Sequence, residues 1–256
     1  MPKGIPGKLR ALEKKLTGDS FWGRFARYVL NTTWDEDYDV RGNTVKQRHQ
    51  PSQRVRRLAV QVAQNPSLFS THLPQFVVAD GHRLYEFGVK LAGVLYSQET
   101  VEAVITAQLC TLPEMQTQFI GGYFAGLQAR FPDLWEASMS RLLEDNASRE
   151  VGVAVLLRGG ISENILRLLL NLFRQRQVQA AAFSRLAWQA KTDNISQVLV
   201  EEVLGALVHS AEDAALQVAI QLAHFYFFDK ETPRACDAIL VVRLLSADQF
   251  FAESWK

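Results

Sequence analysis

The chain has 256 residues, of which 48% are hydrophobic and 21% are charged, and these proportions exclude a mostly disordered protein. The 8 prolines and 15 glycines also exclude collagen-like or low-complexity architecture. The net charge of +1 indicates no partner by itself, and no apolar run approaches the roughly 20 residues of a membrane span.

Apolar residues recur with a period near 3.6 along most of the chain, which predicts amphipathic helices. Before residue 145, helices are expected over Lys8–Leu16, Phe21–Leu30, Pro51–Gln64, Pro66–Val77, Gly81–Tyr96, Glu99–Leu109, Glu114–Arg130 and Pro132–Leu143, with a long loop over Asn31–Gln50. After it, helices are expected over Ser148–Leu157, Ser162–Phe173, Val178–Ala190, Ile195–Val208, Ala211–Phe228 and Thr232–Leu245. The sequence therefore predicts an all-α fold.

Helix-start signals recur along the C-terminal half. Ser162-Glu163-Asn164-Ile165 and Thr192-Asp193-Asn194-Ile195 lie 30 residues apart, and Thr232-Pro233 follows 40 residues later. Each interval holds two expected helices, and a helix pair that recurs at this spacing is typical of an α-solenoid. The pattern resembles HEAT- or armadillo-like helical repeats over residues 51–256. The resemblance implies stacked helix pairs in a right-handed superhelix. Residues 1–50, which precede them, are expected to form basic helices and a charged loop.

A second resemblance rests on Gly121-Gly122-Tyr123-Phe124-Ala125 and the following Pro132-x-x-Trp135-Glu136. This stretch resembles the helical repeat regions of large multidomain bacterial proteins, some of which lie beside a P-loop NTPase. No Gly-x-x-x-x-Gly-Lys-Ser/Thr occurs in this chain. The aromatic end, Phe250 to Trp255, favours a chain that forms part of a longer assembly, so a regulatory or sensor region of a larger protein is a further hypothesis.

Positive charge is concentrated near the N-terminus. Residues 1–57 hold 13 Lys/Arg and 6 Asp/Glu, and residues 40–79 hold no carboxylate. The candidate contacts for an anionic partner are Arg41, Arg48, Arg54, Arg56 and Arg57, of which Arg54 and Arg57 share a helix face. Two alternatives stay open: these arginines form a solvated face, or they pair with the acidic cluster of residues 35–39 within one surface loop.

No motif predicts a metal, a cofactor or a catalytic residue. Asp35, Asp37 and Asp39 have calcium-loop spacing, but Val40 and Lys46 stand where such a loop needs Gly and Glu. The five histidines and two cysteines show no zinc-ligand spacing, and no nucleophile motif occurs. We expect Cys110 and Cys236 to be buried thiols and His224 to be a core histidine. The Gly121-Gly122 pair inside a helix indicates a close helix contact or a kink.

The function predicted from these observations is a non-enzymatic helical-repeat scaffold that binds a protein partner. The alternative is a nucleic-acid-binding HEAT-like protein related to DNA repair or defence. The low cysteine content favours a reducing compartment, the cytoplasm. The N-terminus lacks the apolar segment of a secretory signal, and we expect no membrane association. The sequence does not predict an oligomeric state.

Overall fold

The structure is a computed structural model that describes residues 18, 20–31, 38–41, 44–47, 50–111, 116–184, 195–228 and 235. Its contacts divide the chain into two compact units, Met1–Leu134 (unit 1) and Trp135–Lys256 (unit 2). The predicted segments, 1–50 and 51–256, stay a prediction. The helices expected over Lys8–Leu16 and Thr232–Leu245 lie outside the described residues.

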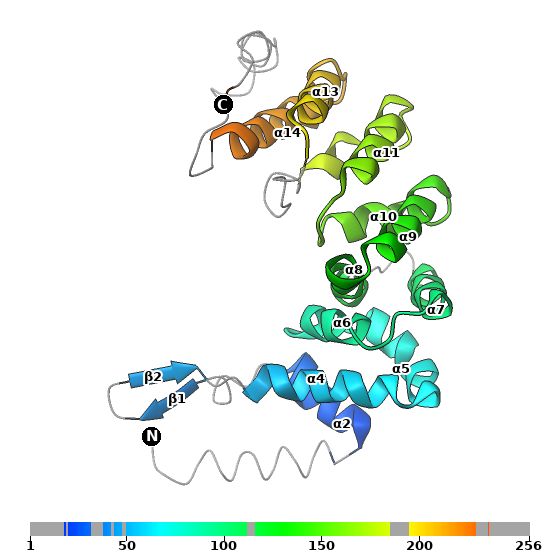
Figure 1. Cartoon of the computed structure of the whole chain (residues 1–256), viewed down its shortest axis with the longest axis vertical. Helices are drawn as coiled ribbons and strands as arrows, with labels where there is room; N and C mark the ends of the chain where they lie inside the picture. Colours follow the sequence, from blue (N-terminus) through cyan, green and yellow to red (C-terminus); the bar gives the residue numbers. More distant parts are fainter. Residues whose placement is uncertain are drawn as a thin grey trace. The chain divides into compact units, whose positions relative to one another are not determined.

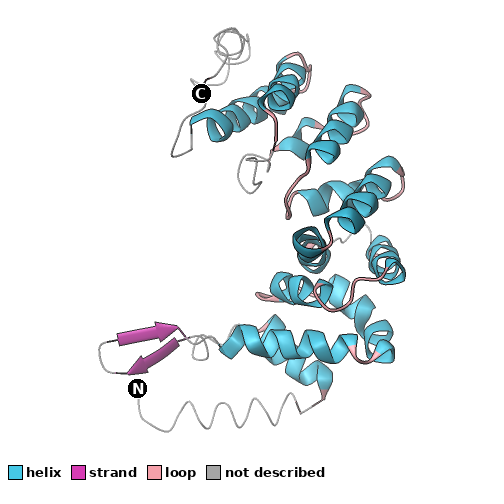
Figure 2. Ribbon diagram, in the orientation of Figure 1, coloured by secondary structure: helices cyan, strands magenta, loops and turns pink. Residues whose placement is uncertain are grey.

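Helices make up most of the described chain (Figures 1 and 2). Unit 1 contains α2 (Phe21–Phe25), the π-helix η1 (Ala26–Leu30), α4 (Gln50–Ala63), α5 (Pro66–Val78), α6 (Leu84–Ala92), α7 (Gln98–Leu109) and α8 (Gln118–Arg130). Helix α9 (Pro132–Glu144) begins at the boundary, and unit 2 continues with α10 (Arg149–Leu156), α11 (Glu163–Arg174), the 3₁₀ helix η2 (Ala180–Phe183), α13 (Gln197–Val208), α14 (Asp213–Ala223) and the π-helix η4 (His224–Phe228). The helical class predicted from the sequence is thus confirmed.

One prediction about the N-terminal region is wrong. The stretch expected to be a loop contains an antiparallel hairpin of β1 (Tyr38–Arg41) and β2 (Thr44–Gln47), in which Tyr38 pairs with Gln47 and Arg41 with Thr44. Two residues, Gly42-Asn43, separate the strands in the sequence, and such dipeptides are typical of hairpin turns. The prediction of a loop did not use this turn signal.

Three differences concern helix limits. Helix α6 covers only the middle of the range expected over Gly81–Tyr96. The helix expected over Val178–Ala190 is described only as η2. The last expected helix of the described part, Ala211–Phe228, changes from α14 to η4 at its end.

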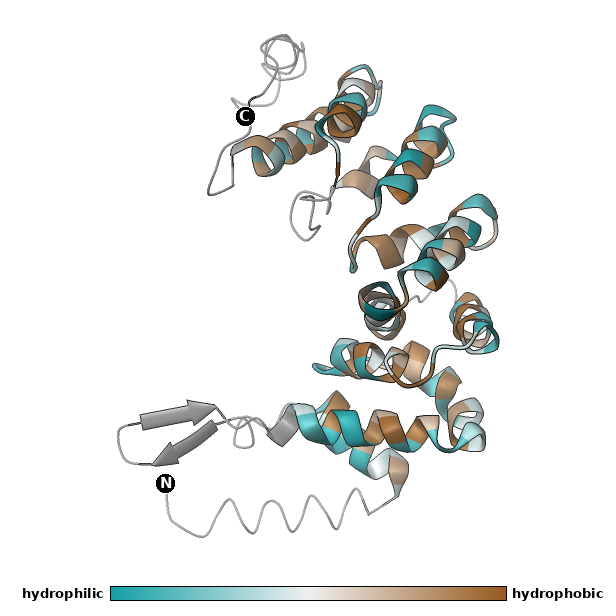
Figure 3. Cartoon of the chain, viewed as in Figure 1, coloured by the Kyte–Doolittle hydropathy of each residue, from teal (hydrophilic) through white to brown (hydrophobic). Residues whose placement is uncertain are grey.

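The helices of unit 1 form two adjoining rows. Helices α4, α6 and α8 contact one another in chain order, α5 contacts α7, and α5 also joins the rows through α4 and α8. Each helix turns an apolar side toward its neighbours, so apolar and polar residues alternate along the ribbons (Figure 3). The side of α4 that is buried consists of Val55, Leu58, Ala59 and Val62, the set predicted from the sequence.

The closest helix contact in unit 1 joins α6 and α8. A Cβ atom at Gly122 would meet the backbone of Tyr85, with its Cα at 2.9 Å, and one at Gly126 would lie 2.7 Å from the Val89 carbonyl oxygen. On the facing helix, a Cβ atom at Gly88 would lie 2.5 Å from the Phe119 carbonyl oxygen. Only glycine allows the two backbones to approach this closely. The sequence indicated either a close helix contact or a kink at Gly121-Gly122. The close contact is therefore confirmed, and Gly122 is the residue that makes it.

The first helices of the described chain pack on this framework through aromatic rings. Phe76 of α5 is fully buried. Its ring centroid lies 4.9 Å from that of Phe25, 5.1 Å from that of Phe87 and 5.6 Å from that of Phe119. These rings come from α2, α6 and α8. One side chain thus connects four helices, and α2 belongs to the core of unit 1.

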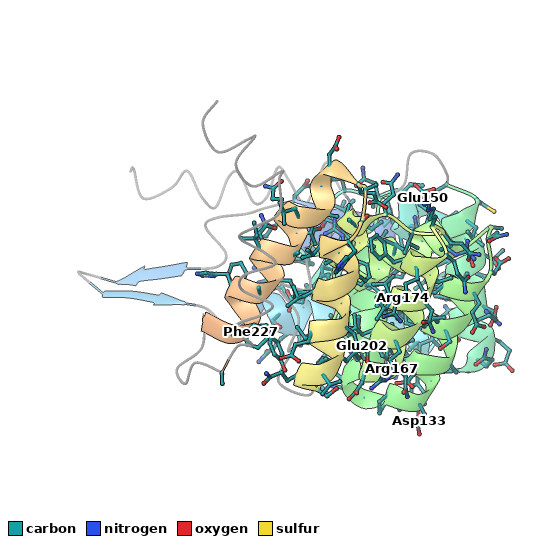
Figure 4. All side chains as sticks on the ribbon, turned by 90° about the horizontal axis from the view of Figure 1, so that it is seen from above. Asp133, Glu150, Arg167, Arg174, Glu202 and Phe227 are labelled. Atoms are coloured by element: carbon teal, nitrogen blue, oxygen red, sulfur yellow. The ribbon has the colours of Figure 1, made fainter. Side chains whose placement is uncertain are left out.

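In unit 2, α11 packs on α13, and α13 packs on α14, which also contacts η2. The Arg174 guanidinium of α11 lies 3.7 Å from the Glu202 carboxylate of α13, and Figure 4 labels both side chains. Both groups are about half exposed, so this pair contributes little to stability. The Glu212 carboxylate accepts a hydrogen bond from the backbone N–H of Ala180 (2.6 Å) and so caps η2.

Long-range side-chain hydrogen bonds join residues at similar sequence separations in both units. In unit 1, Tyr123 donates to the Leu95 carbonyl, 28 residues away, and Gln118 donates to Asp80, 38 residues away. In unit 2, Ser196 donates to Glu163, 33 residues away, and Tyr226 donates to the Ile195 carbonyl, 31 residues away. Each separation spans about two helices, so a helix contacts the second helix after it in the chain.

The end of α11 carries a left-handed residue that is not glycine. Arg176 has φ +59°, and the N–H groups of Arg176 and Gln177 donate to the carbonyls of Phe173 and Leu172 (both 2.9 Å). This is a Schellman motif, whose left-handed position favours glycine.

We therefore expect Arg176→Gly to raise the stability of unit 2 by about 1 kcal/mol, because the left-handed conformation strains a residue with a Cβ atom. Urea denaturation of the full chain followed by circular dichroism measures the change. Arg174→Gly, the same substitution within α11, is the control and should instead lower stability by about 1 kcal/mol. Loss of stability in both variants contradicts the prediction.

Candidate functional site

The structure separates the five arginines predicted to contact an anionic partner. Arg41 lies in β1, where only the backbone is described, and Arg48 lies outside the described residues. Arg54, Arg56 and Arg57 lie on α4, as predicted. Because each residue advances an α-helix by about 100°, Arg54 and Arg57 project on one side of α4 and Arg56 projects on another.

The side of α4 that carries Arg54 lies against α2 and η1. The Arg54 guanidinium lies 4.8 Å from the ring centroid of Tyr28, a cation–π contact that orients it. Farther along α4, the side-chain oxygen of Gln61 accepts a hydrogen bond from Nη2 of Arg24 on α2 (2.9 Å). Arg57 lies between these two contacts in the sequence of α4. We call Arg24, Arg54 and Arg57, together with Tyr28, the arginine face.

The described helices that form the arginine face and its surroundings carry no acidic residue. Residues 20–31 and 50–79, which form α2, η1, α4 and α5, include five arginines and no Asp or Glu. Arg57 is exposed and has no ion-pair partner among the described residues. Exposed positive charge at a surface attracts anions and raises their local concentration. The arginine face is therefore the best candidate site for an anionic ligand in the described chain.

Sequence reasoning missed Arg24 and Tyr28. Both lie in a segment that was correctly expected to be helical, and the absence of carboxylates there was a usable signal. Their proximity to α4 depends on the packing of α2 and η1 against that helix, which the periodicity of a single segment does not reveal.

The described residues form no cluster of metal-binding side chains. No group of three or more His, Cys, Asp or Glu side chains among them is arranged to hold a metal ion. Two minor predictions are corrected: Cys110 is exposed at the C-terminal cap of α7, and His224 is exposed where α14 ends. Cys236 lies outside the described residues.

Glu163, Asp145 and Tyr123 have shifted pKa values, and each of them forms hydrogen bonds that stabilise the local structure. A hydrogen bond from the Ser196 hydroxyl, with a further contribution from Arg167, lowers the pKa of Glu163. The Ser148 hydroxyl similarly lowers the pKa of Asp145, which accepts from the backbone N–H of Ser148 before α10. Burial raises the pKa of Tyr123, whose hydroxyl donates to a backbone carbonyl. These groups stabilise helix ends and the core, and none of them lies on the arginine face.

Comparison with known proteins adds no assignment. No known protein family matches this sequence, and no curated protein or solved structure shows significant similarity to it. Among the described helices, none is sufficiently long and apolar to span a membrane.

Proposed function

We propose that this chain is a non-enzymatic helical-repeat protein that binds an acidic segment of a protein partner through the arginine face. The observation that carries the proposal is the concentration of arginines, without a carboxylate, on α2, η1, α4 and α5. The electrostatic attraction of such a surface increases both the rate and the specificity of association with an anionic partner.

The architecture we propose is a HEAT-like α-solenoid with a right-handed superhelix. Contacts between every second helix in unit 1 support it, as do hydrogen bonds in both units between residues 28 to 38 positions apart. A stack of helix pairs offers an extended surface suited to binding another macromolecule. The low cysteine content supports a cytoplasmic location.

Nucleic acid is the second candidate partner. Guanidinium groups match phosphate oxygens in geometry as well as charge, and the partly exposed Tyr28 ring beside Arg54 offers a surface on which a base can stack. The +1 net charge of the whole chain is low for a nucleic-acid-binding protein, and for this reason we rank an acidic protein first.

Fluorescence anisotropy with the full chain tests both candidates. The probes are a labelled poly-glutamate peptide, duplex DNA, single-stranded DNA and RNA, each titrated at several salt concentrations. We expect the double variant Arg24→Glu/Arg57→Glu to weaken binding of the acidic peptide at least tenfold, because two attractive charges become repulsive. Arg56→Glu is the control on the same helix and should weaken it less than threefold, since its side chain projects away from the arginine face.

The outcomes separate the candidates. Tighter binding of a nucleic acid than of the peptide, with a log–log salt slope of about −0.7 to −0.9 per neutralised phosphate, establishes the second candidate instead. Absence of binding to every probe at low salt contradicts the proposed function, and so does equal loss in the double variant and in Arg56→Glu.

A further inference from the structure

Unit 2 contains an open pocket of about 440 Å³ that is separate from the arginine face. One wall is a side of α10 with the turn before it, and the other wall is the segment that leads from α11 into η2. Its volume lies within the range of sites that bind small ligands and peptide side chains.

Two kinds of side chain line this pocket. Val153, Leu157 and Val178 are aliphatic, whereas Asn146, Gln177 and Gln179 bring three side-chain carboxamides to the pocket. All three carboxamide residues are exposed, and no described residue hydrogen-bonds to their side chains. A carboxamide both donates and accepts hydrogen bonds, as a peptide group does.

The charges at the pocket are balanced. Glu150, labelled in Figure 4, is exposed, and its neighbour Arg149 supplies the opposite charge. Arg149 is fixed in place because its Nε donates to the Leu143 carbonyl (2.7 Å) and its Nη2 to the Glu144 carbonyl (2.9 Å). A pocket lined by one positive and one negative side chain does not favour a phosphate or another strongly charged ligand.

The wall that carries the carboxamides has a defined path. The Schellman motif at Arg176 directs the chain out of α11 immediately before Gln177, and Glu212 fixes the chain at Ala180 immediately after Gln179. Residues 177–179 are thus held at both ends, so a ligand there loses little free energy to ordering the wall.

We propose that this pocket binds an extended peptide segment of a partner protein, with an aliphatic side chain against Val153, Leu157 and Val178 and with the carboxamides hydrogen-bonded to the peptide backbone. The inference rests on the proposed function, since it names a second contact site of the same binding protein. It assigns the pocket to an uncharged, aliphatic segment, which differs from the acidic segment expected on the arginine face.

Selection from a phage-displayed random heptapeptide library on the immobilised full chain supplies the probe. The most enriched peptide is then synthesised with a fluorophore, and its affinity is measured by fluorescence polarisation. We expect peptides that contain Val, Leu or Ile. Val153→Arg should weaken binding at least tenfold because the longer side chain occupies the pocket. Val198→Arg is the matched control, since Val198 is 65% exposed on α13 and does not line the pocket.

A second variant, Gln177→Leu/Gln179→Leu, removes two carboxamides at exposed positions and should weaken binding about tenfold while the circular dichroism spectrum stays unchanged. Failure to enrich any peptide overturns the pocket assignment, as does a peptide that binds Val153→Arg and Val198→Arg equally. In the latter case the chain still binds peptides, so the result contradicts the assignment of the pocket but not the proposed function. Loss of acidic-probe binding by the arginine-face variants is a separate result, and it bears on the proposed function alone.

Discussion

Replacing Gly122 with alanine is expected to destabilise unit 1 by roughly 2–3 kcal/mol, the usual cost of adding an atom to a filled interface. The new methyl group would meet the Tyr85 carbonyl, with the carbonyl carbon only 2.8 Å away. This neighbour is backbone of α6 and cannot change rotamer, so the two helices must separate. Their separation would weaken the matching contacts at Gly88 and Gly126 as well. Thermal and urea denaturation of the full chain measure the loss.

Gly205→Ala is the matched control for this prediction. Gly205 lies inside α13, and a Cβ atom there would meet nothing within 4 Å. The same substitution should therefore stabilise unit 2 by about 0.5–1 kcal/mol, because alanine is the better helix former. If Gly122→Ala also stabilises the protein, then α6 and α8 do not pack as closely as described.

Local signals in the sequence were sufficient to predict most helices of the described chain. Pro66 predicted the start of α5, which begins at that residue, and Ser162 accepts a hydrogen bond from Ile165 N–H at the start of α11. The second predicted cap, Thr192-Asp193-Asn194, lies outside the described residues, and Ser196 occupies the N-cap position of α13. Such signals act within one helical turn, so a single sequence contains them.

Properties that depend on distant contacts were harder to predict. The short helix η2 replaces the start of an expected long helix, and its cap comes from Glu212, 32 residues away. The arginine face has the same origin, because Arg24 and Arg54 come together only when α2 and η1 pack on α4. Periodicity reveals which side of a helix is apolar but not which helix will cover it.

The charge pattern and the core of unit 1 are linked through the N-terminal helices. Helix α2 contributes Phe25 to the aromatic core and Arg24 to the arginine face. These side chains are adjacent in sequence and project on different sides of the helix. Any change that detaches α2 from the core should therefore also disperse the arginine face, which links stability to the proposed binding.

Phe76→Ala tests this link and is expected to cost unit 1 about 3–5 kcal/mol, the range for a large buried aromatic side chain. The substitution removes the ring on which Phe25, Phe87 and Phe119 all pack. Because α2 is short and depends on these ring contacts, we expect it to detach first. Hydrogen–deuterium exchange of the full chain should then show faster exchange in residues 21–30 than in α13, and binding of the acidic peptide should weaken with it.

Val78→Ala, two residues further along α5, is the control that separates the core from the helix itself. Its side chain is 53% exposed, so its truncation should change stability by less than about 0.5 kcal/mol and leave exchange in α2 unaltered. Slow exchange in residues 21–30 of Phe76→Ala, together with unchanged peptide binding, would mean that the N-terminal helices are held by α4 alone. In that case the aromatic cluster stabilises α5, α6 and α8 without positioning the arginine face.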